Sequence, residues 1–203
     1  MGIVEGVPAG LPIDIAAINH ELWRRQQGYG RGGRMKIEDD KVEILSGVRH
    51  GVSMGSPIAM IIENKDFVHW QDVMSVGEPD AEIDNPRNVT RPRPGHADLA
   101  GGQKYGARDL RNILERASAR ETAARVACGA IAKQLLTTFG IEIKSHVIRL
   151  GPVQAVPLWR DWDEIASIPE DSPLRCADEA AQKEMIKAID EAKKEGDTLG
   201  GIY

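Results

Sequence analysis

Arginines gather around a glycine-rich turn in the first fifth of the chain. From Trp23 to Lys36 the sequence holds no acid, and its five basic residues are Arg24, Arg25, Arg31, Arg34 and Lys36. Glycines let backbone N–H groups approach an anion closely, and the guanidinium fork matches phosphate and carboxylate oxygens. In a protein of net charge −5, this cluster indicates a small, multiply charged anion rather than nucleic acid. A solvated surface turn is the alternative.

The same turn contains the letters of a dinucleotide-binding fingerprint. Gly28, Gly30 and Gly33 satisfy the pattern G-x-G-x-x-G. That fingerprint works when it follows a strand and opens a helix, because the helix N-terminus then meets the pyrophosphate. Here the order is reversed, with a predicted helix before the turn and a predicted strand after it. The pattern therefore does not indicate a Rossmann site.

A second pair of arginines lies on the most strongly predicted helix, over residues 109–139. Arg116 and Arg120 are four residues apart and share a face, where like charges cost about 0.2–0.5 kcal/mol. No acid three or four residues away relieves either of them. Their partner is therefore either a carboxylate on another element or an anionic ligand, with the hydroxyl of Ser118 close by.

His96 is the main candidate for acid–base chemistry. It lies in Arg91-Pro-Arg-Pro-Gly-His-Ala-Asp98, a rigid turn flanked by arginines. Imidazole is the side chain that exchanges protons near neutral pH. A structural or solvent-exposed histidine is the alternative. The histidines and acids do not show metal-ligand spacing, so no metal site is expected.

Apolar periodicity predicts the elements that position these residues. In chain order they are a helix over 15–27, strands over 35–38, 42–45 and 57–63, the helix over 109–139, a strand over 141–150, a helix over 177–195 and a further strand from about 196. The first two strands form a hairpin, and the proline-rich residues 76–96 form a long loop. No regular βαβ rhythm is present, so we predict an α+β fold with antiparallel sheets packed against long central helices, in one domain over residues 1–203.

Composition limits the class of protein. Hydrophobic residues make up 41% and charged residues 28% of the 203 residues, which is typical of a soluble globular domain. Apolar runs fall short of the roughly 18 residues that span a bilayer. Cys128 and Cys176 are too few for a disulfide framework. We therefore expect a cytoplasmic protein without membrane or nucleic-acid partners.

Several segments together resemble the chorismate synthase family, from residue 2 to residue 203. They are Glu-Gly-Val-Pro-Ala-Gly-Leu-Pro at 5–12, Arg-Arg-Gln-Gln-Gly-Tyr-Gly-Arg-Gly-Gly-Arg-Met at 24–35, Ser-Gly-Val-Arg-His-Gly at 46–51, Arg-Pro-Gly-His-Ala-Asp at 93–98, Leu-Glu-Arg-Ala-Ser-Ala-Arg-Glu-Thr at 114–122 and Gly-Asp-Thr-Leu-Gly-Gly at 196–201. Their number and order make the resemblance specific.

The resemblance implies a lyase of aromatic amino-acid biosynthesis. The family removes phosphate and a proton from 5-enolpyruvylshikimate 3-phosphate in a 1,4-anti elimination that yields chorismate, the last common step of the shikimate pathway. It uses reduced FMN, although the reaction is redox-neutral overall. The family fold is a sandwich of antiparallel sheets and helices that assembles as a homotetramer.

The resemblance also implies roles for nine residues. His96 matches a family histidine that transfers a proton near the flavin. The other eight match or accompany anion contacts: Arg25 and Arg31 for the substrate or NADP, Arg116, Ala117 and Ser118 for FMN, and Arg34, Arg49 and Arg120 as further contacts.

The resemblance has gaps at both ends. Family members carry a Gly-Glu-Ser-His-Gly segment, with a second histidine, before the point where this sequence starts, and further FMN contacts after it stops. We therefore expect the chain by itself to be inactive or nearly so. Two other interpretations stay open: an FMN-binding or oligomerisation module without turnover, and a flavin reductase that uses NADPH.

Overall fold

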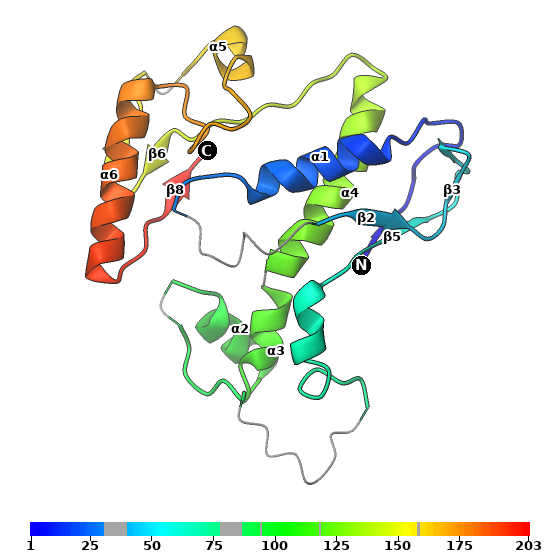
Figure 1. Cartoon of the computed structure of the whole chain (residues 1–203), viewed down its shortest axis with the longest axis horizontal. Coiled ribbons are helices and arrows are strands. Elements are labelled where there is room, and N and C mark those ends of the chain that lie inside the picture. The colour runs from blue at the N-terminus through cyan, green and yellow to red at the C-terminus, as the bar shows by residue number, and fades with distance from the viewer. Residues whose placement is uncertain (31–39, 78–86, 94, 118, 158) are drawn as a thin grey trace. The chain divides into compact units, whose positions relative to one another are not determined.

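The computed structural model describes residues 1–30, 40–77, 87–93, 95–117, 119–157 and 159–203 (Figure 1). The chain divides into two compact units. Unit 1 comprises Met1–Ile15 and Asp40–Gly129, and unit 2 comprises Ala16–Asp39 and Ala130–Tyr203. Each unit is described by itself below. The single domain over residues 1–203 stays a prediction.

Unit 1 contains a three-stranded antiparallel sheet (Figure 1). Strand β5 (Ile58–Ile62) is central and pairs with β1 (Gly2–Val4) on one side and β2 (Val42–Ile44) on the other. Ile58 and Met60 are buried, because alternate residues of a strand face the same side of a sheet. The strands predicted over 42–45 and 57–63 are confirmed. The strand predicted over 35–38 lies outside the described residues.

A short hairpin carries Arg49. It joins β3 (Val48–Arg49) to β4 (Val52–Ser53), with Arg49 opposite Val52. The two turn residues between them, His50 and Gly51, both have positive φ, at 51° and 77°. Such a turn matches the twist of an antiparallel pair and favours glycine at its second position. The hairpin leaves Arg49 exposed.

The helices of unit 1 follow the sheet in sequence. They are the short 3₁₀ helix η2 (Lys65–His69), α2 (Asp98–Tyr105), α3 (Arg111–Arg116) and α4 (Ala119–Thr137), whose last residues belong to unit 2. Helices α2 and α3 pack closely because Gly101 faces Ile113, where a Cβ would lie 2.4 Å from Ile113 Cγ2. Helix α2 ends at Gly106, which has a left-handed backbone.

The single helix predicted over residues 109–139 is wrong, because the structure has two helices in its place. Helix α3 ends at Arg116, and the residue that caps it, Ala117, has a φ of −113° and a ψ of 11°. The Ala117 N–H donates to the carbonyls of both Ile113 and Leu114, at 3.1 and 3.2 Å, which tightens the last turn. The alanine-rich sequence favours one long helix, but propensity is a weak term that the contacts of α3 with α2 override.

Unit 2 pairs a second antiparallel sheet with helix α6 (Glu179–Glu195). The sheet has the strand order β7 (Val153–Gln154), β6 (Arg149–Leu150), β8 (Gly201–Ile202), and α6 lies beside it (Figure 1). Four buried residues form the core of this packing: Ala155, Cys176, Ala181 and Met185. The helix predicted over 177–195 is confirmed, since Asp178 caps its start and Gly196 ends it.

The rest of unit 2 contains a confirmed prediction and a correction. Helix α1 (Ile15–Gln26) confirms the helix predicted over 15–27, and α5 (Trp162–Ala166) is an additional short helix. The strand predicted over 141–150 is wrong apart from its last two residues, because residues 141–148 do not form a strand, although the Ile148 N–H donates to the carbonyl of Ile202 in β8 at 2.9 Å. Ile141 and Ile143 are 47% and 55% exposed, so their alternation does not mark a buried sheet face.

The predicted α+β class is confirmed, since helices accompany small antiparallel sheets in both units. In the described part of the chain, no helix combines the length and the apolar character that crossing a membrane requires.

Candidate functional site

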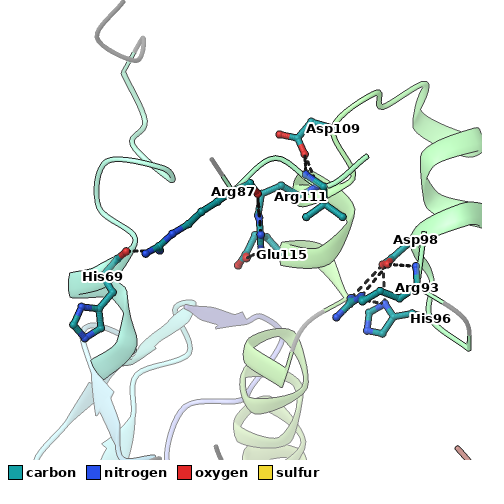
Figure 2. Close-up of polar contacts among 9 residues, drawn as sticks. His69, Arg87, Arg93, His96, Asp98, Asp109, Arg111 and Glu115 are labelled. Atoms are coloured by element: carbon teal, nitrogen blue, oxygen red, sulfur yellow. Dashed lines mark hydrogen bonds and ion pairs between the residues drawn. The ribbon is translucent and has the colours of Figure 1, made fainter. Parts of the chain in front are cut away.

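A buried carboxylate organises the loop that carries His96 (Figure 2). Asp98 is the first residue of α2, and its side chain is 0% exposed. Its Oδ2 accepts hydrogen bonds from the backbone N–H and the Nε of Arg93, at 3.0 and 2.9 Å. Its Oδ1 accepts a third from Arg93 Nη2 at 3.3 Å. Asp98 therefore fixes the loop to the start of α2.

The same carboxylate contacts His96. The Nδ1 atom of His96 lies 2.9 Å from Asp98 Oδ1 and 3.0 Å from Arg93 Nη2. The imidazole side chain is 33% exposed, while the carboxylate that it contacts has no exposed surface. The structure therefore holds one ring nitrogen of His96 and leaves the ring open to a ligand.

Electrostatics keep Asp98 ionised. The hydrogen bond from the Arg93 guanidinium holds the pKa of Asp98 well below its ordinary value, although burial acts in the opposite direction. Further lowering comes from the Arg93 backbone N–H and from His96. A carboxylate at the first residue of a helix also meets the positive end of the helix dipole. Near neutral pH the cluster thus contains a carboxylate, a guanidinium and an imidazole.

A hollow of about 310 Å³ lies between α2 and α3, beginning at the residue after His96. Its lining contains two cations and no carboxylate, and consists of Ala97, Ala100, Gly101, Lys104, Tyr105, Ile113, Arg116 and Ala117. The rest of the lining is apolar apart from the phenol of Tyr105. The hollow therefore suits a ligand that combines an anionic group with an apolar body.

Tyr105 brings the two cations of this hollow together. The guanidinium carbon of Arg116 lies 4.5 Å from the centre of the Tyr105 ring, and Lys104 Nζ lies 5.5 Å from it. Arg116 Nη2 also donates to the Tyr105 hydroxyl, at 3.2 Å. Among the described residues, the partner of Arg116 is thus an aromatic phenol rather than a carboxylate, which leaves its positive charge uncompensated by an acid.

A second set of contacts holds the chain that leads into the site (Figure 2). Arg111, on α3, donates from Nε and Nη2 to the carbonyl of Arg87, at 3.2 and 2.9 Å. Arg87 Nη1 donates to the carbonyl of His69 at 2.6 Å. Both guanidinium groups lie over the ring of Trp70, at 4.4 and 4.8 Å from its centre. These contacts connect three segments of unit 1 that are distant in sequence.

The structure brings together three of the nine predicted site residues. Ala117 and Arg116 line the hollow, and His96 directly precedes the lining residue Ala97. Arg49 lies on the exposed β3–β4 hairpin. Arg25 belongs to unit 2, in the last turn of α1, with its Nε buried. Four predictions fall outside the described residues or side chains: Arg31, Arg34, Ser118 and the side chain of Arg120.

In unit 2, two acids that precede or follow the predicted arginine cluster in sequence partly neutralise it. Arg24 Nη1 lies 2.6 Å from Glu21 Oε2, and its Nε lies 3.9 Å from Glu170. Arg175 is an additional member, and burial together with the nearby Arg24 lowers its pKa. The Nε and Nη1 of Arg175 are buried without a hydrogen-bond partner among the described residues. An anion would supply acceptors for such donors.

Sequence reasoning missed four residues that the geometry places at the site: Arg93, Asp98, Lys104 and Tyr105. The available signal was local, since Asp98 follows His96 by two residues. Helix α2 was not expected, because the adjacent Gly101 and Gly102 weaken a helical pattern. Without α2, nothing in the sequence places Lys104 beside Arg116.

Comparisons with known proteins give a consistent result. The sequence model of the chorismate synthase family matches residues 1–203. The chain is 57% identical over 201 residues to the chorismate synthase of Geobacillus thermodenitrificans and 58% identical over 204 residues to chorismate synthase 1 of Bacillus cereus. Each match covers 98% of this chain and 52% of the relative.

A solved structure shows the same similarity in three dimensions. A crystal structure of chorismate synthase matches with a TM-score of 0.68 and 43% sequence identity. The match covers 98% of this chain and 51% of that one. The chain thus spans about half the length of the relatives that it matches.

Proposed function

The chain belongs to the chorismate synthase family, and from this premise we propose that it forms part of an enzyme that converts 5-enolpyruvylshikimate 3-phosphate to chorismate and phosphate. The reaction is a 1,4-anti elimination in which a C–H bond and a C–O bond to phosphate break and a new double bond forms. The observation that carries the proposal is the family match across residues 1–203, with 57% identity to a curated member.

His96 supplies the proton-transfer group in this proposal. Its Nδ1 contacts Asp98 and Arg93, so the ring is oriented while a third of the side chain stays exposed. An oriented imidazole next to a cationic hollow is suited to exchanging a proton with a bound ligand. General acid–base groups of this kind contribute about 10²–10⁴-fold to turnover.

The hollow between α2 and α3 fits one part of FMN. Arg116 and Lys104 suit its phosphate, and Ala117, Ile113 and the Tyr105 ring offer an apolar and aromatic surface to the rest of the molecule. Reduced FMN, when bound, supplies an electron-rich flavin to the reacting substrate. In this proposal Arg116 and Ala117 hold the cofactor, together with Ser118, as the family resemblance implies.

Arginines hold the anionic substrate in this proposal. The substrate carries two carboxylates and a phosphate, and the guanidinium fork binds such groups in two-point contacts. Arg25 and Arg31 are the principal contacts, with Arg34, Arg49 and Arg120 as further ones. The buried, unsatisfied nitrogens of Arg175 support an anion in unit 2. A cationic site also stabilises charge on a departing phosphate.

The proposal extends to the setting of the enzyme. We propose a homotetramer in the cytoplasm that acts in aromatic amino-acid biosynthesis, with NADPH as the source of electrons for its flavin. A flavin reductase activity that consumes NADPH is the second candidate, and it predicts NADPH oxidation with free FMN.

The test is phosphate release from 5-enolpyruvylshikimate 3-phosphate under anaerobic conditions with reduced FMN. We would compare this chain with the completed chain, defined as this chain extended at both ends with the flanking segments of the Geobacillus thermodenitrificans relative. That relative itself serves as the positive control. We expect the completed chain to release phosphate and to form chorismate in equal amounts.

Two results would contradict the proposal. A folded completed chain that binds FMN but releases no phosphate would favour a binding module. NADPH oxidation without phosphate release would favour the reductase. Measuring the original chain in parallel tests the expectation that it is inactive by itself.

A further inference from the structure

We propose that Asp98 is a positioning residue that keeps the proton of neutral His96 on Nδ1 and thereby makes Nε2 the atom that exchanges a proton. The inference rests on the proposed function, because it takes His96 as the proton-transfer group. It adds a residue, a tautomer and a reacting atom to that function.

The position of Nδ1 between a donor and an acceptor decides the tautomer. Asp98 Oδ1 lies 2.9 Å from Nδ1, and Arg93 Nη2 lies 3.0 Å from it. An unprotonated Nδ1 would place its lone pair against an ionised carboxylate oxygen in a buried setting, which is repulsive. A protonated Nδ1 donates to that oxygen, and Arg93 Nη2, which contacts both Nδ1 at 3.0 Å and Oδ1 at 3.3 Å, then donates to Oδ1 alone. The carboxylate therefore favours the Nδ1–H tautomer.

Asp98 cannot turn away from the histidine. Its side chain has no exposed surface, and its Oδ2 accepts from both the backbone N–H and the Nε of Arg93. Since Oδ2 is held by two donors, Oδ1 stays directed at the imidazole. The hydrogen bonds that secure Asp98 thus also secure the ring orientation of His96.

The arrangement leaves Nε2 for the reaction. Within the described residues, every polar contact of His96 uses Nδ1, and Nε2 has none. With its proton on Nδ1, the neutral ring presents a lone pair at Nε2 and can accept a proton there. Ala97, the residue that follows His96, lines the cationic hollow, so the histidine is adjacent in sequence to the candidate ligand site.

The substitution Asp98→Asn reverses the tautomer if the inference is right. The amide oxygen must take the place of Oδ2, because two Arg93 donors point at that position. The amide NH₂ then takes the place of Oδ1 and faces Nδ1. The NH₂ group and Arg93 Nη2 are both hydrogen-bond donors. Nδ1 must therefore accept a hydrogen bond from one of them, and it can do so only when it is unprotonated. The proton of neutral His96 is thereby moved to Nε2.

The readout is long-range ¹H–¹⁵N NMR of the chain carrying ¹⁵N-labelled histidine, recorded at about pH 8, above the ordinary pKa range of histidine side chains. The signals of His96 are assigned by their loss in His96→Gln. We expect the Nδ1–H tautomer in the unmodified chain and the Nε2–H tautomer in Asp98→Asn. Glu170→Gln is the matched control, because it changes the carboxylate that contacts His20 and should leave the His96 signals unchanged.

The unmodified chain alone can overturn the inference, even if Asp98→Asn does not fold. An Nε2–H tautomer of His96 in that chain contradicts it. So does a folded Asp98→Asn variant that keeps the Nδ1–H tautomer, which would limit Asp98 to a structural role.

Steady-state kinetics of the completed chain give a second, independent test of the role of Asp98. We expect Asp98→Asn to lower kcat by about 10–10²-fold with little change in KM, and to have an effect below about 3-fold in a His96→Gln background, because residues that act as a unit are non-additive. Equal losses in both backgrounds would contradict the inference. Lack of turnover in the completed chain would instead remove the proposed function and leave the tautomer result standing.

Discussion

Each unit contains a histidine paired with a carboxylate. The two pairs have similar N···O distances but differ in how exposed their side chains are. In unit 1, His96 Nδ1 lies 2.9 Å from Asp98, with side-chain exposures of 33% and 0%. In unit 2, His20 Nε2 lies 2.8 Å from Glu170, with exposures of 49% and 53%. The N···O distance alone therefore does not distinguish a buried carboxylate that orients an imidazole from an exposed ion pair.

The difference lies in what holds the carboxylate. Asp98 accepts three hydrogen bonds from Arg93 and begins a helix, so it has a single orientation. Glu170 is approached by Arg24 only at 3.9 Å and is half exposed. Water competes for an exposed carboxylate, and two mobile side chains lose entropy when they pair. A buried and fully bonded carboxylate has neither weakness, which is why the unit 1 pair is suited to directing a proton.

The largest expected effect is on turnover. In the completed chain, His96→Gln should lower kcat by about 10²–10⁴-fold, which is the usual contribution of a general acid or base, while FMN binding stays largely intact. His20→Gln should change kcat by less than about 2-fold, because its carboxylate partner is exposed and it belongs to no proposed site. Phosphate release under anaerobic conditions measures both. Similar losses in the two variants would remove the functional contrast between the two pairs.

A smaller effect is expected from loosening the helix that begins at Asp98. A Cβ at Gly101 would lie 2.4 Å from Cγ2 of Ile113, a β-branched residue that is 4% exposed. Overpacking of this kind costs about 1–3 kcal/mol, more than the roughly 0.5–1 kcal/mol gained by replacing a helical glycine. We therefore expect Gly101→Ala to lower the free energy of unfolding, as measured with urea.

Gly129 provides the matched control for that substitution. It lies within α4, and no heavy atom beyond its neighbours lies within 4 Å of a Cβ built there. Gly129→Ala should therefore stabilise the chain by about 0.5–1 kcal/mol. If both substitutions stabilise equally, the close packing of α2 on α3 does not exist as described, and the burial of Asp98 loses its support.

Local sequence signals were sufficient to predict the helices and strands that bury one apolar face. Helices α1 and α6 and strands β2 and β5 were predicted because their buried residues recur at the correct period, as Ala181, Met185 and Ala192 do on α6. The alternation of Ile141 and Ile143 gave the same kind of signal without a buried face. Periodicity therefore predicts an element only where tertiary contacts make use of it.

The candidate site was predictable in its residues and not in its contacts. His96 and Arg116 were found from their types and from the family resemblance. Arg116 was expected to meet an acid or a ligand, and its hydrogen-bond partner among the described residues is the phenol of Tyr105 rather than an acid. That contact depends on α2, a helix whose two adjacent glycines, Gly101 and Gly102, conceal it in the sequence. Contacts between elements are long-range information that local propensity does not contain.

Acid unfolding tests the buried pair through its charge. Arg93 and His96 are the charged and titratable groups that contact Asp98, and the pKa of Asp98 is lowered in the folded chain. A lowered pKa stabilises the folded state above the ordinary aspartate pKa of about 4, and that stability is lost as the pH falls below it. Asp98→Asn should therefore be less stable than the original chain at pH 7, with a difference that shrinks below about pH 4.

Urea unfolding at a series of pH values measures this difference. Gly129→Ala changes no charge, so its effect on the free energy of unfolding should be the same at every pH. A difference between Asp98→Asn and the original chain that is constant from about pH 7 to about pH 3 would mean that the ionised carboxylate does not stabilise the fold.

The smallest effect is expected for the exposed pair. A double-mutant cycle with His20→Gln and Glu170→Gln should give a coupling free energy of about 0.2–1 kcal/mol, the usual range for solvent-exposed ion pairs. Because salt screens exposed charges over about 10 Å at 0.1 M, the coupling should fall further in about 0.5 M NaCl. Stacking of His20 on Trp23, at 5.4 Å between ring centres, gives the imidazole a contact that does not depend on Glu170. A coupling above about 2 kcal/mol, unaffected by salt, would show that exposure does not separate the two pairs.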